Sequence, residues 1–285
     1  MENLLRPRSL GELMEVLPAA PNHAFVAGGT DWVVKNHGQI GADLVIIDLS
    51  RVSGLYGLSC SGGTLRVGAM ETMTAINSNE NVKKYAAALG DAASVMGSLQ
   101  IRNRATLGGN LANASAAADT PSTLAALGAR VKVCSPRGER TVTIEEALGA
   151  KPNTSALAAD EVIVAFEIPA VENRLSAFKK IGSRSEVSIA RLNMAVAARS
   201  EGGLLSCVRV YVGTLGSAAR RCSAAEEALS LPAAERPAAL REALAEFAEK
   251  SIPGRSTLPY KRSAIQALGL DVLALLEARA AERAA

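Results

Sequence analysis

The sequence predicts an α+β protein divided into two or three compact units. Its length of 285 residues exceeds that of an ordinary single domain, which has roughly 100–200 residues. Hydrophobic residues make up 48% of the chain, enough to fill extended cores. Short apolar stretches bounded by glycine and polar turns, typical of strands, alternate with stretches whose apolar residues recur at helical spacing.

The first unit is expected to open as a βαβ arrangement. Ser9 is a candidate N-cap, because its hydroxyl can accept a hydrogen bond from the first turn of a helix over residues 9–17. The residues that follow predict a strand at 24–26 running into Gly28 and Gly29, a helix at 31–36 and a buried strand at 44–49.

Turn residues and glycines then predict a hairpin over residues 54–68, at the start of a second unit. Pro121 is a candidate first-turn residue of a helix within the small-residue stretch 111–129, which can pack closely against backbone or a ligand. The other elements predicted here are helices at 72–76, 82–96 and 145–148 and strands at 131–134, 140–142 and 161–168.

The polar residues 171–175, just after Pro169, are the best candidate for a domain boundary. Beyond them, alternating apolar residues predict antiparallel strands at 176–181, 194–200 and 204–215. The remaining chain is rich in alanine, glutamate and arginine and is interrupted by prolines, which predicts helices. The last unit is therefore also expected to be α+β.

Composition argues against several classes of function. Lysine and arginine total 31 against 28 acidic residues, and these charges are scattered, so no basic stripe for nucleic acid is predicted. Aromatic residues are only 3% of the chain, too few for base-stacking platforms. Apolar runs fall far short of the roughly 20 residues that cross a bilayer. The first residues lack the basic and apolar regions of a secretion signal, so a cytoplasmic location is expected.

Cysteine and histidine offer little chemistry of their own. No cysteine pair has the spacing of a zinc or iron–sulfur site, and all four are predicted to be buried small hydrophobes. They are Cys60, Cys134, Cys207 and Cys222. His23 and His37 are the only histidines. We therefore expect redox or transfer chemistry to come from a bound cofactor.

Two glycine-rich loops are the candidate binding elements. The first, VAGGTD at 26–31, joins a strand to a helix, and the second, QIRNRATLGGN at 100–110, contains hydroxyl and amide side chains. Glycine lets backbone N–H groups approach an anion closely. Taken separately, the first loop is better explained as a plain strand-to-helix turn, and the second is also explained as a bulged loop with a capping asparagine. Taken together, the two could hold the two ends of one extended diphosphate ligand.

The same residues resemble a known family. AGGTD at 27–31 and the long string QIRNRATLGGNLANASAAADTPSTLAALGA from residue 100 are similar to the FAD-binding medium subunit of molybdenum hydroxylases, the xanthine dehydrogenase and carbon monoxide dehydrogenase family. The likeness covers nearly the whole chain and continues through EVIVAFEIP at 161–169 and AFKKIGSRSEVSIARLNMAV at 177–196. It implies a two-part FAD-binding domain of the vanillyl-alcohol-oxidase/MurB (PCMH) type and a C-terminal α+β domain. The implied ranges are 1–54, 55–172 and 173–285.

The resemblance also implies which residues bind the cofactor. Backbone amides of the two loops would hold the diphosphate, Asp119 would lie near the flavin and ribityl chain, Ile163 would pack on the isoalloxazine, and Lys179 would lie near its polar edge. The loop residues that match are Phe25, Val26, Ala27, Gly28, Gly29, Thr30 and Asp31, and Thr106, Leu107, Gly108, Gly109 and Asn110.

Three of these residues have a second interpretation. Asp119 precedes Thr120 and Pro121 and is equally well placed to cap a helix, a role compatible with flavin contact. Burial in the core is the default interpretation of Ile163, and Lys179 fits a solvated strand residue as well.

The function implied by the resemblance is electron transfer. A single, non-covalently bound FAD would receive electrons from a [2Fe-2S] partner subunit and pass them to NAD⁺ or another acceptor, while hydroxylation would take place on a partner carrying the molybdopterin cofactor. No residue of this chain is predicted to be catalytic. A stand-alone flavin reductase of the MurB type and a non-catalytic scaffold that has lost redox function are the alternatives.

Overall fold

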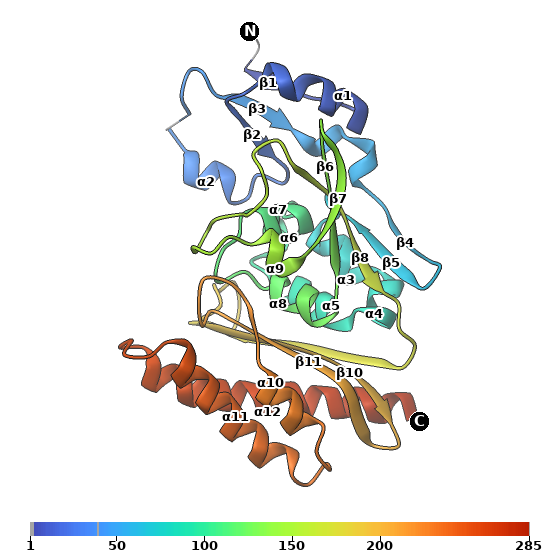
Figure 1. Cartoon of the computed structure of the whole chain (residues 1–285), viewed down its shortest axis with the longest axis vertical. Helices are drawn as coiled ribbons and strands as arrows, with labels where there is room; N and C mark the ends of the chain where they lie inside the picture. Colours follow the sequence, from blue (N-terminus) through green and yellow to red (C-terminus); the bar gives the residue numbers. More distant parts are fainter. Residues whose placement is uncertain (1–2, 39, 285) are drawn as a thin grey trace.

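The computed structural model describes residues 3–38 and 40–284. Three sheets follow one another along the long axis of the molecule in chain order, with the N-terminal sheet at one end and the C-terminal helices at the other (Figure 1). The mixture of sheets and helices confirms the predicted α+β class. None of the described helices is both long and apolar enough to cross a membrane.

The first sheet confirms the predicted βαβ opening. Its strands run parallel in the order β1-β3-β2, with α2 connecting β2 to β3 along the chain. The Ser9 hydroxyl accepts the N–H of Glu12 and caps α1, as expected. The elements are β1 (Leu4–Leu5), α1 (Leu10–Val16), β2 (His23–Val26), α2 (Trp32–Asn36) and β3 (Val45–Asp48), with short 3-10 helices at Leu17–Ala19, Leu49–Arg51 and Ser53–Leu55.

The second sheet is antiparallel, with the order β4-β5-β8-β6-β7, and begins with the predicted hairpin. Its strands are β4 (Leu58–Ser61), β5 (Thr64–Gly68), β6 (Arg130–Ser135), β7 (Gly138–Thr143) and β8 (Val162–Pro169). The helices of this region are α3 (Met73–Ser78), α4 (Glu80–Tyr85), α5 (Ala87–Ser94), α6 (Leu99–Arg102), α7 (Leu107–Ala112), α8 (Thr120–Ala126) and α9 (Ile144–Ala147).

One helix prediction in this region is wrong. The single helix expected at 82–96 is two helices, because Ala86 has φ −143° and ψ 43°, outside the helical range. The change of direction lets α5 pack against α3 and β9.

The third sheet has the order β12-β11-β10-β9 and is antiparallel, as predicted. Three helices cover its outer face (Figure 1). The elements are β9 (Arg174–Ile181), β10 (Leu192–Glu201), β11 (Leu204–Gly213), β12 (Arg220–Arg221), α10 (Ser223–Leu229), α11 (Arg236–Ser251) and α12 (Leu258–Ala284).

Both faces of the third sheet are buried near its centre. Along β10, Met194 and Val196 belong to the core formed with the C-terminal helices, whereas Ala195 and Ala197 belong to the core of the middle region. Successive side chains of a strand point to opposite faces, so this sheet separates the two cores. The inner face is covered by α5 and α8.

The three predicted domain ranges each contain the strands of one sheet. The hydrophobic cores cross those ranges, since Val162 and Val164 of β8 pack in the core beneath the first sheet. The ranges 1–54, 55–172 and 173–285 therefore stay a prediction.

The cysteine prediction is correct only in part. Cys134 and Cys222 are buried, but Cys60 is half-buried and Cys207 is exposed. Cys207 has φ 49° and lies where the pairing of β10 with β11 shifts register. A bulge adds a residue to one strand and turns side chains there out of the regular alternation, which residue type alone does not reveal.

Candidate functional site

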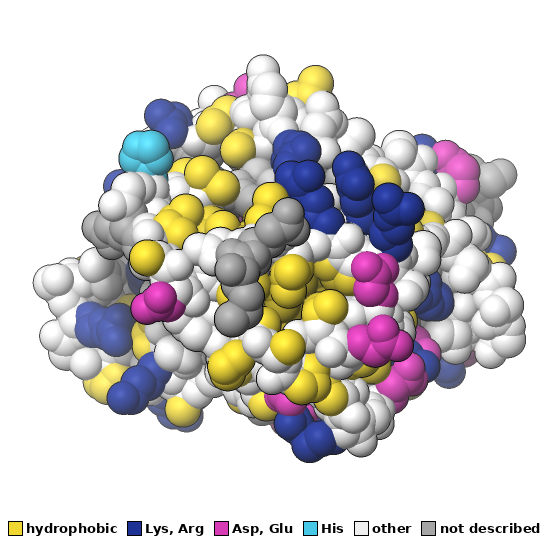
Figure 2. Space-filling view, turned by 90° about the horizontal axis from the view of Figure 1, so that it is seen from above, with side chains coloured by type: hydrophobic (Ala, Val, Ile, Leu, Met, Phe, Trp, Pro, Cys, Tyr) yellow, Lys and Arg dark blue, Asp and Glu magenta, His cyan; other side chains and the backbone are white. Residues whose placement is uncertain are grey.

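A cavity of about 720 Å³ is lined by the segment after β2, by α7 and its preceding turn, and by residues 153–163. Its walls are mostly apolar, with convergent polar groups, which is typical of a small-molecule or cofactor site. At the end of the molecule formed by the first sheet, hydrophobic side chains gather toward the middle of the surface, beside a group of lysines and arginines (Figure 2).

Most of the residues predicted to bind the cofactor line this cavity. They are Phe25, Ala27, Gly28, Gly29, Thr30, Asp31, Thr106, Gly108, Gly109, Asn110 and Ile163. Four others do not contribute to its wall, namely Val26, Leu107, Asp119 and Lys179. Leu107 is fully buried and anchors α7 in the core of the middle region.

The two glycine-rich loops are in direct contact. A Cβ on Gly28 would lie 1.8 Å from the carbonyl oxygen of Arg104, so only glycine allows the backbones to approach this closely. A Cβ on Gly108 would lie 2.9 Å from the carbonyl oxygen of Ala69, to which the Gly108 N–H donates at 2.8 Å. Segments about 80 residues apart in the sequence thus form one continuous wall.

The two loops differ in how many of their backbone N–H groups are already hydrogen-bonded within the protein. At the start of α7, Leu107 N–H donates to Glu71, Gly108 N–H to Ala69, and Gly109 N–H to the Thr106 hydroxyl. Within the described chain, the N–H groups of residues 28–31 have no backbone or side-chain acceptor. The free donors therefore lie mainly in the first loop, because among residues 106–110 only the Thr106 N–H likewise has no acceptor in the described chain. The rest of the second loop supplies a close-packed surface, and the binding of a diphosphate by both loops stays a prediction.

Side chains that the sequence reasoning missed connect α2 to the end of α7. Asn113 donates to the Asp31 carboxylate at 2.7 Å and accepts from the Lys35 ammonium. All three residues line the cavity. Deeper in the site, Asn110 accepts from the Thr120 hydroxyl at 2.5 Å, which joins α7 to α8. The string NLAN at 110–113 places both asparagines within one turn of helix, a signal that could have identified Asn113.

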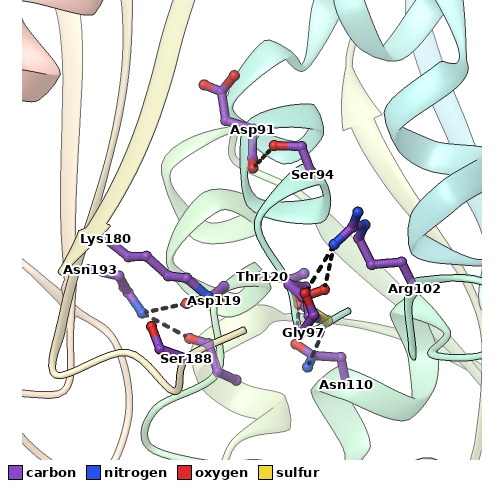
Figure 3. Close-up of polar contacts among 12 residues, drawn as sticks. Asp91, Ser94, Gly97, Arg102, Asn110, Asp119, Thr120, Lys180, Ser188 and Asn193 are labelled. Carbon is purple, nitrogen blue, oxygen red and sulfur yellow. Dashed lines mark hydrogen bonds and ion pairs between the residues drawn. The ribbon is translucent and has the colours of Figure 1, made fainter. Parts of the chain in front are cut away.

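Asp119 occupies the N-cap position of α8 but does not cap it with its side chain. Its carboxylate accepts from Lys180 at 2.7 Å and from Asn193 at 3.4 Å, and these side chains point toward one another (Figure 3). The side chains of Asp119 and Lys180 are only 6% and 10% exposed. Burial raises the pKa of Asp119, although the adjacent Lys180 ammonium opposes that change. The helix-capping interpretation is thus wrong for the side chain.

The structure places Lys179 away from this cluster. Lys179 is exposed and pairs in register with Met194, on the face of the sheet that carries the C-terminal helices. Lys180 pairs with Asn193 on the opposite, inner face. A shift of one residue along a strand reverses the face, so Lys180 is the lysine of this region that faces α8.

Ile163 lies in β8 and is 6% exposed. It belongs to the core of the middle region and also lines the cavity, so the two interpretations of this residue are compatible. Neither His23 nor His37 contributes to the cavity wall of the described chain. The two ring nitrogens of His23 face the carbonyl oxygens of Ala20 and Ala159, at 2.7 and 3.0 Å.

Glu161 closes one side of the cavity and gives a pH-dependent prediction. Both its oxygens accept from Arg140, at 2.6 and 2.8 Å, and it also accepts the N–H of Ala158. The Arg140 bonds lower the pKa of Glu161 to about 2. A depressed carboxyl pKa stabilises the folded state above about pH 4.5, and that stabilisation is lost as the pH falls toward 2.

We therefore expect Glu161→Gln to lower the free energy of unfolding by about 1 kcal/mol at pH 7, because Arg140 is half-exposed and its pairing is screened. Urea unfolding at a series of pH values measures the difference, which should shrink between pH 4.5 and pH 2. The variant Glu139→Gln, at an exposed position of β7, is the control. A Glu161→Gln difference that does not change with pH would contradict this role.

The chain is similar to known proteins in both sequence and fold. The family described as the FAD binding domain in molybdopterin dehydrogenase matches residues 1–171. The xanthine dehydrogenase FAD-binding subunit of Escherichia coli is 31% identical over 225 residues, covering 78% of this chain and 77% of that protein. The nicotine 6-hydroxylase medium subunit of Paenarthrobacter nicotinovorans is 32% identical over 224 residues, covering 79% and 78%.

Solved structures share the whole fold. Quinoline 2-oxidoreductase from Pseudomonas putida 86 contains a chain that matches with a TM-score of 0.84 and 27% identity, covering 96% of this chain and 95% of that one. Carbon monoxide dehydrogenase from Hydrogenophaga pseudoflava gives a TM-score of 0.86 at 25% identity, with 97% of each chain covered. The sequence match, the fold and the glycine-lined cavity agree, and the chain therefore belongs to the family of FAD-binding subunits of molybdenum hydroxylase-type dehydrogenases, as an oxidoreductase component.

Proposed function

We propose that this chain takes electrons from a [2Fe-2S] partner subunit and delivers them through its FAD to NAD⁺ or another acceptor, while a molybdopterin-bearing partner oxidises the substrate. The observation that carries the proposal is the row of free backbone N–H groups at residues 28–31, facing a cavity of about 720 Å³. A dinucleotide carries its negative charge on a central diphosphate, and such a row of donors suits that charge.

The residues present fit FAD. Gly28 and Gly29 lie in the cavity wall beside the free amides, and Phe25, Ala27 and Ile163 supply apolar wall for ring systems. Asn110 and Asn113 present amide groups suited to hydroxyls of a ribityl chain or ribose. When bound, FAD supplies an electron carrier that exchanges one or two electrons at a time.

The protein's own part in this function is binding and orientation. The contact between Gly28 and Arg104 holds the two loops at a fixed separation, and the Asp31–Asn113–Lys35 hydrogen bonds tie α2 to α7 across the cavity. The Asp119–Lys180 pair ties α8 to the inner face of the third sheet. Covalent attachment through histidine would need His23 or His37 at the flavin ring, and neither residue lines the cavity of the described chain, which supports non-covalent attachment. A cytoplasmic location, expected from the sequence, stays part of the proposal.

The alternatives make different demands on the site. A stand-alone reductase of the MurB type needs a proton donor facing the flavin as well as its own substrate pocket. The buried Asp119 is engaged by Lys180 and Asn193 rather than aimed into the cavity. A scaffold without redox function has no need for free backbone donors beside a cavity, yet residues 28–31 keep theirs. Electron transfer is therefore favoured over both.

The test begins with the chain saturated with FAD under anaerobic conditions. We expect NADH to be oxidised with an artificial electron acceptor, and purines or other N-heterocycles to be left unchanged because this chain has no hydroxylating centre. Co-expression with its partner subunits should then restore hydroxylation coupled to the same acceptor. Purine hydroxylation by the chain alone would contradict the subunit assignment. A protein that takes up no FAD and shows no absorbance near 450 nm would support the scaffold.

A further inference from the structure

Three arginines line a second hollow, at the opposite end of β9 and β10 from the Lys180–Asn193 pair. Arg174, Arg199 and Arg209 line a cavity of about 190 Å³ between the end of α8 and the neighbouring strands. Its other walls are apolar side chains, Cys207 and the backbone near Gly128. No acidic residue of the described chain lines it.

The register of the sheet brings these charges together. Arg199 of β10 lies directly opposite Arg174 of β9, and Arg209 of β11 pairs with Ala197, two residues before Arg199. Alternation places all three side chains on the inner face, which α8 covers only as far as residue 126. Arg199 and Arg209 are exposed and Arg174 is half-buried. Because like charges directly opposite one another destabilise a sheet, an anion bound between them would stabilise this arrangement.

A bulge at Cys207 lies beside this group of charges. Arg209 pairs with Ala197 in the same register as Tyr211 with Ala195, which places its side chain on the inner face, and the extra residue between Ser206 and Arg209 makes Ser206 the partner of Arg199. Its guanidinium lies against Gly128, where a Cβ would be 2.5 Å from Nη1. Gly128 also has φ +70°, a left-handed backbone conformation that glycine adopts most readily. Glycine is therefore favoured here both by the backbone conformation and by the lack of space for a side chain.

The three guanidinium groups are not neutralised within the described chain. Arg174 donates to the carbonyl oxygen of Pro169 at 2.7 Å, and none of the three forms an ion pair with a described carboxylate. Burial, together with the charges of Arg209 and Arg199, lowers the pKa of Arg174 to about 10. Elsewhere in the third sheet and its helices, by contrast, Arg221 and Arg262 are paired with glutamates.

We propose that Arg174, Arg199 and Arg209 form a binding site for a small oxyanion, either a phosphate group or a carboxylate, separate from the flavin cavity. Guanidinium groups offer paired N–H donors that match the oxygens of both kinds of anion. The site lies at the opposite end of β9 and β10 from the Lys180–Asn193 pair. Anion binding there should therefore stabilise the third sheet without changing the binding of the flavin.

The experiment uses the FAD-loaded protein, so that the flavin occupies its own diphosphate site. Inorganic phosphate and acetate are each compared with chloride at equal ionic strength. Phosphate should raise the thermal midpoint by about 2 °C or more, because a ligand bound only to the folded state stabilises it. Acetate should give a comparable rise if the site takes carboxylates, and none if it requires a phosphate.

Arg199→Gln and Arg209→Gln should each weaken anion binding at least tenfold in calorimetric titration, with the 450 nm flavin absorbance unchanged. Without an oxyanion, each variant should also be more stable than the wild type, because one of the opposed charges is gone. Arg241→Gln, at an exposed position of α11, is the matched control and should change neither quantity. The site is refuted if phosphate and acetate shift the midpoint no more than chloride does, or if Arg209→Gln retains wild-type anion affinity.

Discussion

Gly28→Ala should reduce FAD affinity more than a hundredfold. The added Cβ would lie 1.8 Å from the carbonyl oxygen of Arg104, and neither partner in this contact can move aside as a flexible side chain would. The two loops must then separate, which displaces the free N–H groups of residues 28–31 from the position that suits a diphosphate. Titration of the apoprotein with FAD, followed by quenching of flavin fluorescence, measures the effect.

Gly41→Ala is the matched control for this variant. A Cβ at Gly41 meets no atom within 4 Å, so FAD affinity should remain at the wild-type value. Far-ultraviolet circular dichroism of Gly28→Ala tests whether the sheets remain folded. Wild-type FAD affinity in Gly28→Ala would show that contact between the loops is not required for binding.

Lys180→Met should lower the free energy of unfolding by about 3 kcal/mol, because it leaves the buried Asp119 carboxylate without its cation. Asp119 is 6% exposed at its side chain, and Asn193 alone cannot neutralise it. The loss should become smaller as the pH falls, since burial already raises the pKa of Asp119 and a protonated carboxyl no longer needs the cation. Urea unfolding at several pH values gives both quantities.

Two further variants test whether the Asp119–Lys180 ion pair, rather than a general change in packing, accounts for the lost stability. Lys179→Met changes the adjacent, exposed lysine on the other face and should cost less than about 0.5 kcal/mol. Adding Asp119→Asn to Lys180→Met should recover most of the lost stability, because the unpaired charge is removed. Equal losses for Lys179→Met and Lys180→Met would show that the ion pair does not account for the effect.

The sequence alone was sufficient for the local elements and the family. Ser9, the glycine turns and the alternation of strands near 194–200 predict structure through contacts between residues close in the chain, and the structure confirms them. The motif QIRNRATLGGN identifies the family because its order of residues is long and specific. The cavity position of Gly28, Thr106 and Asn110 follows from that resemblance.

Only the tertiary structure decided which backbone N–H groups are already hydrogen-bonded and which charged side chains lie close together. Only the fold shows that the amides at the start of α7 are bonded to Ala69 and Glu71 while those of residues 28–31 are not. Strand register selects Lys180 over Lys179, and it also brings Arg209 and Arg174 to the same face of the sheet as Arg199. These outcomes depend on contacts between segments far apart in the chain, which a residue's own neighbours in sequence do not determine.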